Sequence, residues 1–193
     1  VDAQDADGLL HCAAVALRRA KTQGSAQFGF YDPALDRAIE ARRALAQELR
    51  DALEAGTLAL HYQPQFDTRS GQLCGYEALM RWPHPTRGMV SPGEFIPLAE
   101  ETGLIEALGA WALQRACAEA RDWPPYLTVS VNLSAAQFHG TRELPDVVAE
   151  ALRESGLPAA RLELEITESQ LMRDTELAQR ERRLEVHLAH DRA

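Results

Sequence analysis

Three strand-like segments separated by helix-like segments constrain this chain's fold more than any other feature. The strand-like segments are 72–82, 127–133 and 161–166, and helical patterns at 105–122 and 143–155 lie between them. In the second and third strands, apolar residues alternate with polar ones, so each strand has an apolar face and a polar face. Strands that alternate with helices favour a parallel α/β sheet or barrel. We therefore expect an α/β fold with helices over the apolar face.

Shorter patterns predict the remaining elements. The turn-forming stretch Asp67–Gly71 separates two strands. Ser91 and Pro92 are suited to the N-cap and first position of a helix. The other expected elements are helices at 7–23, 34–55 and 92–103, strands at 27–31 and 58–66, and a charged helix after Ser169 followed by a strand at 186–189.

Polar side chains stand near the C-terminal ends of the three main strands. Glu77, Asn132 and Glu165 each follow the alternation that puts them on the polar face. Barrel enzymes build their active sites at this end of the strands. Clustered carboxylates need compensation, which a hard divalent cation with oxygen ligands provides. The spacing leaves a second interpretation open, in which these residues are ordinary surface or hydrogen-bonded groups.

Composition narrows the classes of partner. The net charge is −9, with 29 acidic and 20 basic residues, which argues against a nucleic acid polymer. Cys12, Cys74 and Cys117 form no C-x-x-C pair, and isolated thiols fit the reducing cytoplasm. No apolar run approaches the roughly 18 residues that a membrane span needs.

Five short motifs occur in an order that resembles the EAL domain family, over roughly residues 45 to 175. The motifs are Tyr76-Glu77-Ala78-Leu79-Met80-Arg81-Trp82, His61-Tyr62-Gln63-Pro64, the stretch from Ser91 to Glu100, Ser130-Val131-Asn132-Leu133-Ser134, and Leu164-Glu165-Ile166-Thr167-Glu168-Ser169. A lone Glu-Ala-Leu would carry no information, but five ordered matches are specific.

The resemblance implies a modified (β/α)₈ TIM barrel that hydrolyses cyclic di-GMP to linear pGpG with Mg²⁺ or Mn²⁺. By motif position it implies that Glu77, Asn132 and Glu165 are metal ligands and that Gln63 and Arg81 contact the substrate. Glu77 and Glu168 would be catalytic, with Glu168 bracing an active-site loop. The resemblance also implies a cytoplasmic protein and a homodimeric parent, and this chain has no expected membrane segment.

The first 32 residues resemble the C-terminal end of a GGDEF, or diguanylate cyclase, domain. The similar residues are Ala13 to Lys21 and the strand expected to end at Tyr31. We expect three regions: a helix–strand remnant of that domain at 1–32, a linker helix at 33–55, and the N-terminal part of an EAL domain at 56–193.

The EAL pattern is incomplete near the end of this sequence. The family continues into an Asp-Asp-Phe-Gly-Thr-Gly segment and a catalytic Lys strand, whereas this chain ends Asp191-Arg192-Ala193. A complete barrel needs about 250 residues, so we expect the first half of one. Whether Asp191 is a metal ligand stays open.

Two functional interpretations follow. One is a fragment of a metal-dependent phosphodiesterase that is inactive alone, and the other is a degenerate EAL module that senses the nucleotide or binds a protein partner. His84, in a Pro-His-Pro loop near Arg81, is either a loop residue or a further substrate contact.

Overall fold

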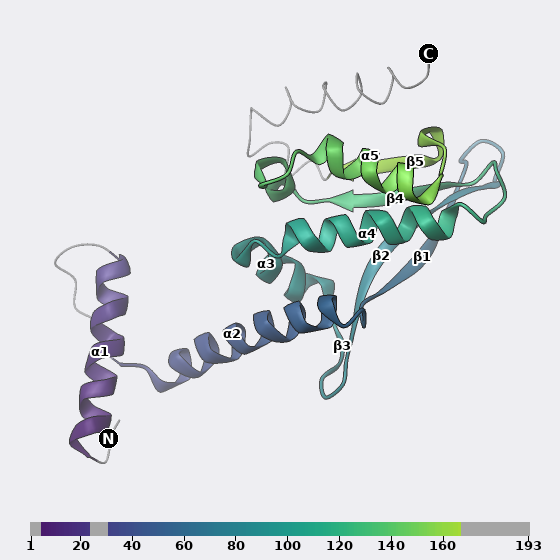
Figure 1. Ribbon diagram of the computed structural model, residues 1–193. Coiled ribbons are helices and arrows are strands. Elements are labelled where there is room, and N and C mark those ends of the chain that lie inside the picture. The colour runs from purple at the N-terminus through teal and green to yellow at the C-terminus, as the bar shows by residue number, and fades with distance from the viewer. Residues whose placement is uncertain (1–4, 24–30, 167–193) are drawn as a thin grey trace. The chain divides into compact units, whose positions relative to one another are not determined.

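The computed structural model describes residues 5–23 and 31–166, and the chain divides into two compact units. The first unit covers residues 1–47 and the second covers 48–193. The second unit contains the β-sheet and its covering helices (Figure 1). In the described part of the chain, no helix combines the length and apolar character that a bilayer crossing requires.

Two helices precede the sheet, α1 (Ala6–Gln23) and α2 (Pro33–Glu54). Asp5 and Asp32 stand just before them and accept hydrogen bonds from backbone N–H groups of the first turns at 2.7 and 2.9 Å. Such bonds satisfy donors that have no partner within the helix. Both helices agree with the sequence-based expectation to within about a residue.

Five strands form one sheet within the described residues, in the order β1-β2-β4-β5, and β3 pairs with β2. β1 and β2 are antiparallel, whereas β4 is parallel to both β2 and β5. This arrangement confirms the predicted α/β fold, and the antiparallel β1 makes the sheet mixed. The strands are β1 (Ala59–Phe66), β2 (Leu73–His84), β3 (Gly88–Val90), β4 (Thr128–Leu133) and β5 (Leu162–Ile166).

Helices α4 and α5 lie beside one another over one face of this sheet (Figure 1). Val129, Val131 and Leu133 of β4 point to that face and are buried, as the alternation predicts. The remaining helical elements are α3 (Pro92–Thr102), α4 (Ile105–Ala120), the 3₁₀ turn η1 (Ala135–His139), α5 (Leu144–Ser155) and the 3₁₀ turn η2 (Ala159–Arg161).

Helix α3 begins and ends where the sequence indicates. The Ser91 hydroxyl accepts a hydrogen bond from the backbone N–H of Gly93 at 3.3 Å, and Pro92 takes the first helical position. The helix ends at Gly103, whose φ of 74° is accessible to glycine at little cost.

Sequence patterns missed β3, η1 and η2. The second strand was expected to end at Trp82 but continues to His84, because Trp82, Pro83 and His84 pair with β3. A three-residue strand is too short to give a periodic signal.

Some expected elements cannot be compared with the structure. Residues 27–30 and everything after Ile166 lie outside the described ranges, and Tyr31 belongs to no helix or strand. The strands expected at 27–31 and 186–189 and the helix after Ser169 therefore remain predictions.

None of the three cysteines, all of which lie in the described residues, forms a disulfide bond. Cys12 and Cys117 are buried and Cys74 is exposed. Burial raises the pKa of the Cys117 thiol to about 11, so this thiol stays protonated and unreactive at neutral pH.

Gly75 makes the close approach of β2 and β4 possible. The two strands pair here, with Gly75 and Thr128 as Cα partners. A Cβ on residue 75 would lie 2.7 Å from the backbone oxygen of Thr128 and would also collide with its Oγ1.

We therefore expect Gly75→Ala to destabilise the second unit by about 1–3 kcal/mol, because the backbone would have to shift. Urea denaturation followed by circular dichroism measures this change. Gly93→Ala is the control, since its Cβ would meet only Ser91 Oγ at an ordinary 3.6 Å. Equal stability of the two variants would contradict the close-approach argument.

Arg161 ties the start of β5 to the loop between α4 and β4. Its buried guanidinium donates to the backbone carbonyls of Leu127 at 2.9 Å and Ala120 at 2.8 Å. Ala120 is the last residue of α4, where unpaired carbonyls and the helix dipole favour a cation.

Arg161→Ala is expected to cost about 2–3 kcal/mol of unfolding free energy, because buried carbonyls lose charged donors. Arg153→Ala is the control, since the Arg153 side chain is 71% exposed and its ion pair with Glu150 spans 4.0 Å. Thermal melts of both variants test the difference, and a similar Tm for both would show that the Arg161 bonds contribute little.

Candidate functional site

Glu77 of β2 and Asn132 of β4 lie together on the face of the sheet opposite the core. Asn132 Nδ2 donates to Glu77 Oε1 at 2.6 Å. The Cα partner of Glu77 in β4 is Ser130, two residues before Asn132, so alternation puts the Glu77 and Asn132 side chains on one face. The structure thus brings these two predicted residues into direct contact.

Glu165 lies on the same face but contacts a different residue. Its Cα partner in β4 is Asn132, yet its Oε1 accepts a hydrogen bond from Gln65 Nε2 at 3.1 Å. Gln65 Oε1 in turn accepts a bond from the buried hydroxyl of Ser130 at 3.1 Å. Gln65 pairs with Gly75 across β1 and β2, and because Gly75 has no side chain, Gln65 can extend toward β4 and β5.

Sequence patterns missed Gln65. A glutamine in an edge strand carries no chemical signal, and its role depends on the antiparallel register of β1 with β2. Its place opposite a glycine is the one indication that could have been used.

The predicted substrate contacts are Gln63 of β1 and Arg81 of β2. By strand alternation, both side chains lie on the same face of the sheet as Glu77. Gln63 is exposed and is the Cα partner of Glu77. Arg81 is half-buried, and its Nη1 donates to the backbone oxygen of Met80 at 2.9 Å. The guanidinium keeps further N–H donors for a phosphate group. The predicted positions of Glu168 and Asp191 lie outside the described residues.

A cavity of about 220 Å³ lies beside Arg81 and Asn132, where the ends of β2 and β4 meet α3 and α4. Its lining is mostly apolar. Ile96 of α3, Ile105 of α4 and Leu133 of β4 contribute to it.

The donor chemistry of this face fits a hard divalent cation. Glu77 and Glu165 offer carboxylate oxygens, and Asn132 offers an amide oxygen while its NH₂ group donates to Glu77. In the described part of the chain, no group of three His, Cys, Asp or Glu residues is arranged to hold a metal. An ion here would therefore depend on the Asn132 amide or on residues outside the described ranges.

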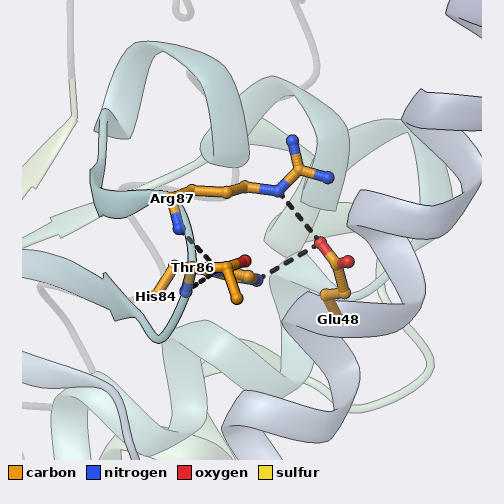
Figure 2. Close-up of polar contacts among 4 residues, drawn as sticks. All are labelled: Glu48, His84, Thr86 and Arg87. Atoms are coloured by element: carbon orange, nitrogen blue, oxygen red, sulfur yellow. Dashed lines mark hydrogen bonds and ion pairs between the residues drawn. The ribbon is translucent and has the colours of Figure 1, made fainter.

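The His84 ring is held by contacts with Thr86, Arg87 and Glu48 (Figure 2). Its Nδ1 accepts the backbone N–H groups of Thr86 at 3.3 Å and Arg87 at 3.2 Å. Nε2 therefore carries the proton and lies 3.3 Å from Glu48 Oε2, which Arg87 Nε also contacts at 3.2 Å. The geometry favours a loop-forming role over a substrate contact.

Comparison with known proteins places this chain in one protein family. The model of the EAL domain family matches residues 46–189. An uncharacterized protein y4lL of Sinorhizobium fredii is 50% identical over 89% of this chain, and the bifunctional diguanylate cyclase/cyclic di-GMP phosphodiesterase MucR of Pseudomonas aeruginosa is 40% identical over 91%. The chain spans 21% and 26% of the lengths of these relatives.

A solved structure of the PaMucR phosphodiesterase in complex with c-di-GMP has the same fold. It superposes with a TM-score of 0.69 at 42% sequence identity, covering 75% of this chain and 60% of that one. The likeness confirms the expected fold, in which the described sheet and helices correspond to part of a TIM-like barrel.

We expect His84→Ala to lower the unfolding free energy by about 1–3 kcal/mol, because two backbone N–H groups lose their acceptor and a side chain that is only 7% exposed is removed. Urea denaturation measures the loss, with His61→Ala as the control at an exposed position of the neighbouring strand. An unchanged midpoint for His84→Ala would mean that the ring is available for another role.

Proposed function

Because the chain belongs to the EAL domain family, we propose that it supplies part of the active site of a cyclic di-GMP phosphodiesterase. In this proposal the parent enzyme hydrolyses cyclic di-GMP to linear pGpG with Mg²⁺ or Mn²⁺. One observation carries it: Glu77 and Asn132 are in contact on the same sheet face as Glu165. Three oxygen-bearing side chains from three neighbouring parallel strands are ligands that a hard divalent cation accepts, with water completing its coordination.

Each residue then has a distinct task. Glu77, Asn132 and Glu165 would hold the ion, which neutralises phosphate charge and activates a water when bound. Arg81 would pair its planar guanidinium with a phosphate oxygen. Gln63, the exposed partner of Glu77, would donate to the nucleotide. Glu168 keeps its proposed role of bracing a loop.

The proposal includes several finer predictions. Residues 1–32 would be the remnant of a GGDEF domain, 33–55 a linker helix and 56–193 the N-terminal part of the EAL domain. The parent protein would be cytoplasmic and homodimeric, and it would not bind a nucleic acid polymer.

One observation favours the second candidate, a degenerate EAL module that binds without hydrolysis. Each proposed metal ligand already has a hydrogen-bond partner: Asn132 pairs with Glu77, and Glu165 pairs with Gln65. These bonds orient all three side chains without an ion. Such a module would bind cyclic di-GMP through Gln63 and Arg81 and would not depend on the carboxylates.

We expect the 193-residue chain to bind Mn²⁺ and cyclic di-GMP but to form linear product at a rate near background. The described residues offer ligands for one ion, whereas two-metal chemistry needs further groups, and the loss of grouped catalytic residues is non-additive. Chromatography follows the product, and electron paramagnetic resonance follows Mn²⁺.

Glu77→Ala should abolish Mn²⁺ binding, whereas Glu94→Ala, which changes an exposed carboxylate of α3, should leave it unchanged. Turnover that Glu77→Ala removes would show that this chain is sufficient for catalysis. Nucleotide binding that needs neither Mn²⁺ nor Glu77 would support the binding module instead.

A further inference from the structure

Ser134 directly follows β4, two residues after Asn132, and it makes three hydrogen bonds to neighbouring elements. Its hydroxyl donates to Glu100 Oε1 of α3 at 2.6 Å and accepts from the Ala136 N–H at 3.2 Å. Its own N–H donates to Gln137 Oε1 of η1 at 2.9 Å. Ser134 and Gln137 are each only 6% exposed, so the bond between them is buried, and the other two bonds are partly buried.

Helix α4 leaves space for this arrangement at Gly109. A Cβ on residue 109 would lie 2.6 Å from Gln137 Cδ and would collide with Nε2. The Gln137 amide thus fills the volume that a side chain at 109 would occupy. Three elements, α3, α4 and η1, therefore fix the position of Ser134.

The end of β4 needs such support because its pairing with β2 stops early. The last paired residues are Ala78 and Val131, so Asn132 and Leu133 pair only with β5 within the described residues. The cavity of about 220 Å³ lies at this divergence, with Asn132, Ser134 and Gln137 in its lining. Within the described residues the backbone of Asn132 has no pairing partner in β2, where only the Glu77 side chain contacts Asn132, and the bonds to Ser134 restrain the backbone instead.

We propose that Glu100 and Gln137 are positioning residues that act through Ser134 to hold Asn132 where it can ligate a metal. This inference deepens the proposed function and rests on it. Loss of the supporting bonds would let the strand end shift into the cavity. Partners that orient metal ligands typically contribute about 10- to 100-fold to metal affinity.

Three variants remove the support in different ways. Glu100→Ala deletes a half-buried acceptor, Gln137→Ala deletes the amide, and Gly109→Ala displaces the amide without removing a polar group. Glu100→Gln keeps an acceptor for the Ser134 hydroxyl, so it should retain the position of Asn132 and the Mn²⁺ affinity of the unmodified chain. Glu94→Ala is the matched control on α3, and Arg161→Ala is a control for lost stability at the opposite end of β4.

Two readouts are taken on the 193-residue chain. The first is the chemical shift of the Asn132 side-chain amide in ¹⁵N NMR without metal. It should change in the three variants that remove the support, and it should stay unchanged in Glu100→Gln and in both controls. The second is Mn²⁺ affinity by electron paramagnetic resonance, which should fall by about tenfold or more in the support variants alone.

The outcomes separate the two proposals. An Asn132 resonance that stays in place in Glu100→Ala and Gln137→Ala, or that moves equally in Arg161→Ala, would overturn the positioning role. If the unmodified chain binds no Mn²⁺, the proposed metal site fails, and the metal-free NMR comparison still decides whether these residues position Asn132.

Discussion

Burial of the apolar face of β4 determines where the polar residues of the site stand. Val129, Val131 and Leu133 are in the core under α4 and α5, so Ser130 and Asn132 must point the other way. A register slip of one residue would expose all three apolar side chains and bury the polar ones. The parallel register then aligns Ser130 with Glu77 and Asn132 with Glu165. The hydrophobic core thus fixes the site, although none of these three apolar residues is a proposed metal ligand or substrate contact.

Within the described residues, the polar face has carboxylates on Glu77, Glu163 and Glu165, and their hydrogen-bond partners shown by the structure are neutral. Asn132 donates to Glu77, Gln65 donates to Glu165, and Ser130 lies within 3.4 Å of Glu163. Neutral donors orient a carboxylate without cancelling its charge. The face therefore keeps a negative charge that a divalent cation would offset, which is consistent with oxygen-rich ligation.

Local patterns predicted the parts of this arrangement that depend on neighbours in sequence. Alternation was enough to assign Glu77, Asn132 and Glu165 to one face, and the Ser91 cap and Gly103 marked the ends of α3. The partners of these residues depend on pairings between distant segments. Gln65 reaches Glu165 across 100 positions and Glu100 reaches Ser134 across 34. No periodic signal connects such residues, and only the folded register brings them together.

The separation of β2 from β4 explains why several of the long-range polar contacts lie at strand ends. β2 stops pairing with β4 after Ala78 and turns to pair with β3, so the two strands separate just beyond Glu77. Backbone groups past that point lose the regularity of the sheet and need other restraints. Glu48 holds the β2–β3 hairpin through His84 and Arg87, and Glu100 holds the end of β4 through Ser134. Glu77 and Asn132 lie between these two anchored ends, where a small displacement of either strand would separate them.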